Sequence, residues 1–242
     1  MERKIYLIVV WGVLCSLASA VASPKSDIYQ AYVSNNMTLW KKTIDRMNLQ
    51  NPKSDELRIE LLNYQYGYIG WCMGKKRHKE AESYIELGQK SLQILEKRGT
   101  YASMVQAYKS AFYGFQIGIN LLKAPFIGPK SVACAQLAMK EDPQNPYGFI
   151  QYANAQFYMP SVFGGSKKSA LAYYRKAELL MESDRTKGMG DWNYLSLLAM
   201  IAKTYVELKD IDRAKGYYEK ILHIEPDFLW VKNELYPSVV GK

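Results

Sequence analysis

The segment LSLLAMIAKTYVELKDIDRAKGYYEKILHIEP, residues 195–226, decides the fold of this 242-residue chain. Its apolar residues recur at helical spacing, and a short polar break interrupts the pattern once. We therefore predict two helices, at residues 192–208 and 211–224, with Pro226 ending the second. Because the break between them is short, the two helices should fold back on each other as an antiparallel hairpin.

This hairpin places small, aromatic and aliphatic residues at eight defined positions: Leu198, Ile201, Ala202, Tyr205, Ala214, Tyr218, Ile221 and Pro226. The pattern closely resembles that of the tetratricopeptide repeat family. In such a repeat the small residues, here Ala202 and Ala214, let the two helices approach, and the aromatic side chains fill the space beside them. These demands are steric, so the resemblance implies a fold and no particular chemistry.

The same periodicity continues along the chain and predicts an uninterrupted stack of helices. Residues 148–181 repeat the hairpin pattern with a longer turn at residues 159–165, and two earlier units match it less well. We therefore expect an all-α fold, a tetratricopeptide-type stack of antiparallel hairpins that forms an α-solenoid. The predicted helices span residues 28–34, 37–48, 55–73, 77–97, 101–121, 129–141, 147–159, 167–182, 192–208 and 211–224.

Breaks between these helices contain proline and glycine, and none is long enough to be a linker between domains. We expect capping helices at residues 23–53, the repeats at 54–226 and a C-terminal tail at 227–242. Ser54 is predicted to cap the helix that follows it, and Pro129 to occupy a first helical position.

The first 22 residues have the order of a secretory signal peptide. Basic residues precede an apolar run, and small residues follow it, with cleavage expected after Ala20 or Ala22. An uncleaved anchor is the alternative, because the apolar stretch is at the lower length limit for crossing a bilayer. With the inserted turn at 159–165, this leader resembles exported, periplasmic bacterial tetratricopeptide proteins. After cleavage we expect no stable membrane span.

A net charge of +9 accompanies basic clusters at three predicted turns: Lys41-Lys42, Lys75–Lys79 and Lys167-Lys168. A positive potential there could attract anionic lipids, glycans or an acidic protein, and the alternative is a rim that only keeps the protein soluble. Export argues against nucleic acid as a partner.

No catalytic constellation is found in the sequence. The two histidines, His78 and His223, lie far apart, and neither has a nucleophile and an acid nearby in the sequence. No Cys-x-x-Cys pair or phosphate-binding loop occurs, so we expect no enzyme activity, cofactor or metal. We predict that Cys72 and Cys134 are buried, unpaired thiols.

Tyrosine is unusually frequent, with 20 copies, many of them in the first helices of the predicted repeats. First helices line the concave groove of a tetratricopeptide superhelix, so side chains that point off the packing face should form a ligand surface. Repeat phase in the two best units assigns six groove candidates: Phe149, Tyr152, Gln156, Ser196, Ala199 and Lys203.

Two functions follow from this reading. The first is an exported scaffold that binds a protein or peptide partner in its concave groove without catalysis. The alternative is a periplasmic receptor for a small molecule, associated with transport. A buried polar cavity lined by tyrosines would favour the receptor, and an open groove would favour the protein partner.

Overall fold

The computed structural model describes residues 23–183 and 190–241, and over those ranges it contains helices and turns but no strand. The predicted leader at residues 1–22 lies outside the described residues. No helix in the described part combines the length and apolarity needed to cross a lipid bilayer. The helices are α1 Pro24–Val33, α2 Met37–Leu49, α3 Asp55–Gly74, α4 His78–Arg98, α5 Ala102–Ile119, α6 Ala124–Glu141, α7 Pro146–Tyr158, α8 Lys167–Ser183, α9 Trp192–Glu207 and α10 Ile211–Ile224.

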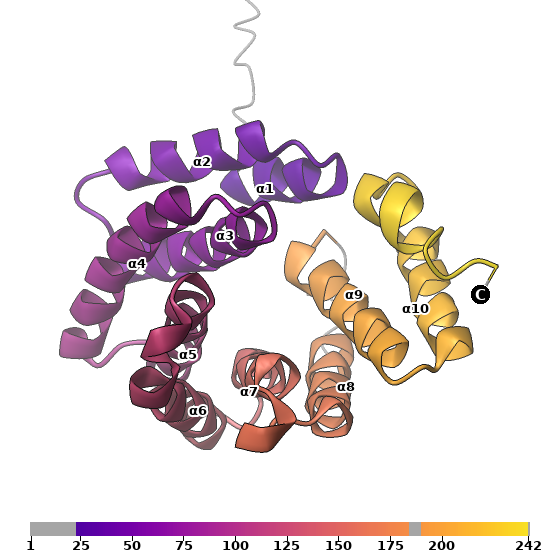
Figure 1. Cartoon of the computed structure of the whole chain (residues 1–242). Coiled ribbons are helices and arrows are strands. Elements are labelled where there is room, and N and C mark those ends of the chain that lie inside the picture. Colours follow the sequence, from indigo (N-terminus) through magenta and orange to yellow (C-terminus); the bar gives the residue numbers. More distant parts are fainter. Residues whose placement is uncertain (1–22, 184–189, 242) are drawn as a thin grey trace, which may run out of the picture.

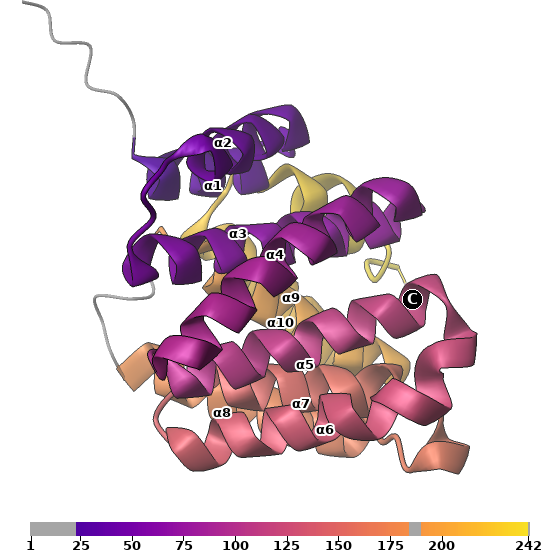
Figure 2. The same cartoon turned by 90° about the vertical axis from the view of Figure 1, so that its left-hand side faces the viewer.

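The helices form hairpins that stack side by side into a strongly curved array (Figure 1). The first helices of the hairpins, α3, α5, α7 and α9, line the inside of the curve, and α4, α6, α8 and α10 cover the outside. In the view of Figure 2, the connections from each first helix to its partner lie at the right-hand end. This is the tetratricopeptide-type solenoid that the sequence predicts.

Local sequence explains where many helices begin. Seven of them start with a side-chain oxygen that accepts a hydrogen bond from a backbone N–H in the first turn. Ser54 does so as predicted, with 3.2 Å between its hydroxyl oxygen and the amide nitrogen of Leu57. The other six capping residues are Ser23, Asn36, Asn145, Ser166, Asp191 and Asp210.

The predicted start of the sixth helix was wrong. We expected Pro129 at the first helical position, but α6 begins at Ala124, and Pro129 lies inside it. Pro125 takes the early position instead, where the missing N–H costs no helical hydrogen bond. The short 3₁₀ turn η1, Leu121–Lys123, leads directly into α6, so the break after α5 is shorter than the two prolines suggested.

The longer turn at residues 159–165 contains a second 3₁₀ turn, η2, at Ser161–Phe163. It folds back on α7, because the N–H of Ser166 donates to the carbonyl of Gln156. Gly165 is required here, since a Cβ at this position would lie 1.9 Å from the carbonyl oxygen of Met159.

The ends of the array meet. The capping helix α1 lies against α9, and this contact closes the curve (Figure 1). The ring of Tyr32 contacts those of Trp192 and Phe228, with centroid distances of 5.7 and 4.8 Å. The segment after α10 also packs onto the last repeat, where Phe228, Val231 and Val239 are buried. It includes one π-type turn, η3, at Val231–Leu235.

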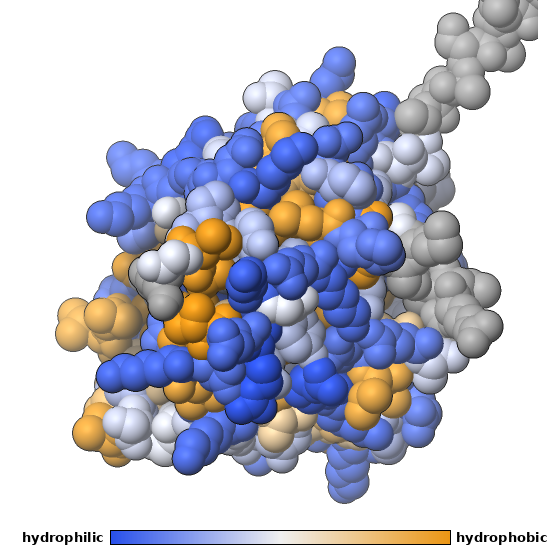
Figure 3. All heavy atoms as spheres, turned by 90° about the vertical axis from the view of Figure 1, so that its right-hand side faces the viewer, coloured by the Kyte–Doolittle hydropathy of each residue, from blue (hydrophilic) through white to orange (hydrophobic). Residues whose placement is uncertain are grey.

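The outer side of the last repeat faces the viewer in Figure 3. That face is largely hydrophilic, with hydrophobic patches between the charged side chains.

Candidate ligand pocket on the concave face

The inside of the curve contains a small, partly open pocket. Four inner or neighbouring helices line it, and its free space is about 20 Å³, enough for about one water molecule. Most of its walls are aromatic or amide side chains. The lining residues are Tyr66, Tyr147, Ile150, Asn154, Tyr174, Trp192, Asn193, Ser196, Leu197 and Met200.

Asn154 is the centre of the hydrogen-bond network in this pocket. Its Nδ2 donates to the hydroxyl of Tyr66 at 3.2 Å and to Oε1 of Gln151 at 3.0 Å. Its Oδ1 accepts from the hydroxyl of Tyr174 at 2.6 Å. Burial raises the pKa of both tyrosines above the ordinary value, so the hydroxyls stay neutral at physiological pH.

Two hydrogen-bond donors in this region have no partner among the described residues. They are Nε2 of Gln151 and Nε1 of Trp192, on side chains that are 2% and 5% exposed. A buried donor without a partner costs about 1–3 kcal/mol, so native proteins rarely leave one unmatched. Both donors are therefore available to a bound water or a ligand with acceptor groups.

Aromatic packing holds the pocket wall in place. Trp192 contacts Trp40 edge to face at 5.0 Å and lies 6.3 Å from the ring of Tyr66. Gly67 makes this packing possible, because a Cβ there would lie 2.5 Å from the ring of Trp40. The Nε1 of Trp40 donates to the carbonyl of Tyr64, which fixes that ring as well.

The six predicted groove residues do not come together in one site. Only Ser196 lines the pocket, and Lys203 is exposed beyond it, with Nζ 5.5 and 5.8 Å from the ring centres of Phe157 and Tyr158. Gln156 and Ala199 are buried among the helices and do not face solvent.

The other two candidates, Phe149 and Tyr152, pack on Tyr173 of α8, with ring centroids 6.4 and 4.5 Å apart. The reason is rotational phase, because α7 turns residues 147, 150 and 154 toward the pocket. The binding role of the six candidates stays a prediction.

Sequence reasoning missed most of the pocket. Tyr66 stood out only as one of many first-helix tyrosines, and Trp192 and Asn154 gave no signal. The excess of tyrosine in first helices was the one feature that could have pointed to the inside of the curve.

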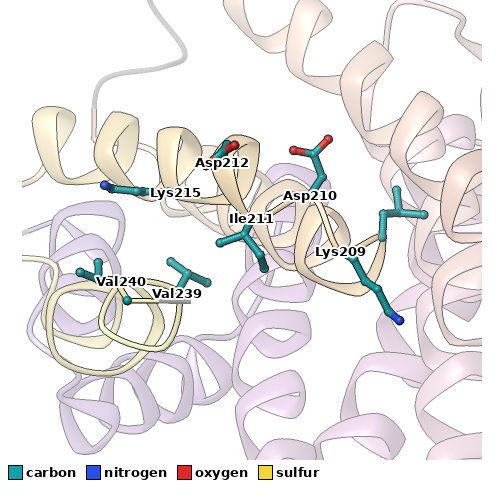
Figure 4. Close-up of a pocket in the computed structure, with 9 residues that line it drawn as sticks. Lys209, Asp210, Ile211, Asp212, Lys215, Val239 and Val240 are labelled. Carbon is teal, nitrogen blue, oxygen red and sulfur yellow. The ribbon is translucent and has the colours of Figure 1, made fainter.

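A larger depression of about 580 Å³ lies between the α9–α10 turn and residues 239–241 (Figure 4). Its charged groups do not converge, since the ammonium groups of Lys209 and Lys215 lie at opposite ends of the view. Asp210 already caps α10 and pairs with Arg213. This open depression therefore lacks the convergent polar groups of a ligand site.

Within the described residues, no group of three histidine, cysteine or acidic side chains is placed to hold a metal ion. Cys72 and Cys134 are both unpaired, as predicted. Cys72 is fully buried, as predicted, but the prediction of burial was wrong for Cys134, which is only half-buried.

No family model and no curated protein matches the sequence. Several solved structures do match in fold, among them a haemophore and a TPR protein. The HusA haemophore from Porphyromonas gingivalis aligns with a TM-score of 0.58 and 17% identity, over 76% of this chain and 92% of HusA. TTC0263, a thermophilic TPR protein of Thermus thermophilus, aligns with a TM-score of 0.56 and 15% identity, over 90% and 97% of the two chains. At these identities the matches establish the tetratricopeptide-type fold alone.

Proposed function

We propose that this chain is an exported, non-catalytic binding protein that takes a small ligand into its concave pocket. The observation that supports this proposal is a pocket inside a curve whose two ends meet. With α1 against α9 the helices form a closed curve (Figure 1), and a small, partly open pocket lined by three tyrosines lies inside it. An extended peptide needs a groove open along its length, whereas a compact ligand needs a pocket and a mouth.

The mouth lies one helical turn beyond the pocket. Tyr158 follows Asn154 by four residues on α7, and Lys203 follows Met200 by three on α9, so both continue the pocket-lining faces. Tyr158 is 65% exposed, and Lys203 is exposed beside it. An aromatic face next to an ammonium group suits a flat, largely apolar ligand that carries an acidic substituent.

A pocket of about 20 Å³ is too small for such a ligand, so binding requires an opening movement. The seam between α1 and the last repeat is the natural place, because few contacts cross it. They include the rings around Tyr32 and one hydrogen bond from Tyr29 to Glu225. Half-buried Met200 and Tyr66 can also change rotamer at the pocket itself.

HusA, which shares the fold, is described as a haemophore. Haem is flat, largely apolar and carries carboxylates, so it is the first ligand to test. Titration of the mature chain with haemin, followed by the Soret band and tryptophan emission, should show saturable binding. Tyr158→Ala and Lys203→Ala should each weaken that binding. The control Tyr101→Ala, at the opposite end of the inner helices, should leave it unchanged.

The molecule that accompanies the native protein provides a second test of the proposal. Native mass spectrometry of the protein purified from its own envelope shows whether a small molecule or a protein accompanies it. A protein bound in the groove, with no small-molecule adduct in the wild type, would contradict the small-ligand proposal.

A protein or peptide partner is the second candidate. Phe149, Tyr152 and Tyr173 form an aromatic cluster that is only half-buried. Aromatic residues are enriched at protein interfaces, where their rigid rings give contact area at a low entropy cost. This cluster would be the anchoring point for such a partner.

A further inference from the structure

Two turns of the array carry the most exposed group of apolar side chains in the central repeats. Leu121 and Leu122 of η1, Phe126 at the start of α6, and Val162 and Phe163 of η2 are each between 74% and 82% exposed. We call these five residues the apolar tips. Single exposed apolar side chains are normal, but several of this size on neighbouring turns indicate an interaction surface.

The two turns lie at the same end of the molecule. They follow α5 and α7, which are neighbouring inner helices in contact with each other. Figure 2 shows both turns at its lower right, and Figure 1 shows both on the side toward the viewer. Hydrophobic side chains also project at the left-hand edge of Figure 3, which is the same end of the molecule seen from the other side.

The charge of the surrounding chain is strongly one-sided. Residues 97–177 contain ten lysines and arginines but only two acidic residues, a net charge of +8 out of +9 for the whole chain. Both acidic residues, Glu141 at the end of α6 and Asp142 just after it, lie where α6 connects to α7, at the opposite end of these repeats (Figure 2). Next to the apolar tips, Lys123 and Lys168 are exposed.

We propose that the apolar tips dock on the surface of a bilayer that contains anionic phospholipid. They project from turns and form no pocket, so they suit a soft surface into which individual side chains insert. The lysines beside them would contact the phosphate groups, and the scarcity of acidic side chains removes the repulsion that an anionic surface would otherwise meet.

The net charge also favours an anionic bilayer over a second copy of the chain as the partner of the apolar tips. Two copies that met through the apolar tips would bring two regions of net charge +8 together. Such like-charge contact opposes association. An anionic surface has the complementary sign.

Sedimentation with vesicles tests the proposal. The mature chain should sediment with vesicles of phosphatidylglycerol mixed with phosphatidylcholine, and not with phosphatidylcholine alone. The double substitution Leu122→Ser with Phe163→Ser should weaken this binding at least about tenfold, because both side chains lose apolar area that the bilayer covers. Lys168→Glu should weaken it as well, and added salt should reduce the binding of the wild type.

The chain offers a matched control for each change. Leu49 is 84% exposed at the end of α2, at the opposite end of the molecule in Figure 2, so Leu49→Ser should leave vesicle binding unchanged. Lys42→Glu, on the exposed side of the same helix, is the matching charge control. Circular dichroism shows whether each variant keeps its helices.

Three results would overturn the proposal. They are no vesicle binding by the wild type, equal weakening by Leu49→Ser, and dimerisation without lipid that the tip substitutions abolish. The last would assign the apolar tips to a second copy. Haemin titration of the tip variant separates this proposal from the ligand pocket, because the two use different residues.

Discussion

The hydroxyl of Tyr29 donates a hydrogen bond of 2.8 Å to a carboxylate oxygen of Glu225, a residue 196 positions further along the chain. This bond joins the first helix of the capping hairpin to the end of α10. Burial, together with the nearby carboxylate, raises the pKa of Tyr29 well above the ordinary value, so the hydroxyl remains a donor. The array is therefore a closed curve, and its two ends stabilise each other.

The closing contacts should differ in strength. Tyr29→Phe removes one partly exposed hydrogen bond and should lower the free energy of unfolding by about 0.5–1.5 kcal/mol. Tyr32→Ala removes the ring that contacts Trp192 and Phe228, and should lower it by about 2–3 kcal/mol. Urea unfolding measures both, and hydrogen exchange should show faster opening of α1. Equal effects would mean that the aromatic contacts do not hold the seam.

The ion cluster between α8 and α10 should make stability depend on pH. Lys220 Nζ lies 2.7 Å from carboxylate oxygens of both Glu178 and Glu182, and Glu178 is buried. Burial would raise the pKa of Glu182, but hydrogen bonds from Lys220 and Tyr194 outweigh it and lower that pKa. An acid with a lowered folded-state pKa stabilises the protein above its unfolded pKa and loses that contribution as pH falls.

Lys220→Met removes this source of stability. We expect the variant to be less stable than the wild type by about 1–2 kcal/mol at pH 7, a modest value because solvent screens the partly exposed lysine. The difference should shrink as pH falls below the ordinary pKa of a glutamate side chain, because Glu182 then takes up a proton and no longer pairs with Lys220. Urea midpoints of both proteins as the pH is lowered measure it, and a constant difference would show that the ion pairs do not contribute.

Two substitutions on α10 test the register of the last repeat. Ala214 is fully buried where the helices of the hairpin approach, so Ala214→Trp should overpack the site and destabilise by about 1–3 kcal/mol or more. Gly216 lies two residues on, exposed, with open space where a Cβ would be. Gly216→Ala should raise stability by about 0.5–1 kcal/mol. Melting temperatures of the two variants measure both effects. An unchanged melting temperature for Ala214→Trp would contradict the predicted register of the last repeat.

The two cysteines should differ in reactivity. Burial raises the pKa of Cys72 to about 12, which leaves about one thiolate in ten thousand at pH 8. Burial raises the pKa of Cys134 too, but that residue is only half-buried. An alkylating reagent at pH 8 should therefore label Cys134 slowly in the native protein and Cys72 only after unfolding. A reductant-sensitive mass would show instead that the cysteines pair.

The aromatic cluster around Tyr152 should distinguish a partner site from a packing role. If a partner binds there, Tyr152→Ala should weaken the binding free energy by at least about 1 kcal/mol. The melting temperature should stay nearly unchanged. Lys203→Ala should reduce binding mainly at low salt. A large drop in melting temperature for Tyr152→Ala would mean that its contact with Tyr173 is structural.

Periodicity and capping residues determined the helices of this protein, because both act within a few residues of the chain. The local sequence of the hairpin at 195–226 determines how it folds, because Ala202 and Ala214 lie where its two helices approach and Pro226 follows the end of the second helix. Ser54 capped α3 for the same local reason. Where two prolines competed, at Pro125 and Pro129, local rules chose the wrong one, since packing against α5 extended α6 backward.

The tertiary structure alone decided what faces the inside of the curve. Small rotations between neighbouring hairpins add up along the array, and their sum cannot be read from the sequence of any single hairpin. That sum brings α1 against α9, joins Tyr29 to Glu225, and turns Asn154 toward Tyr66 and Tyr174 while Gln156 is buried. The pocket is therefore a property of the closed array, because its walls come from helices that the sequence describes only one at a time.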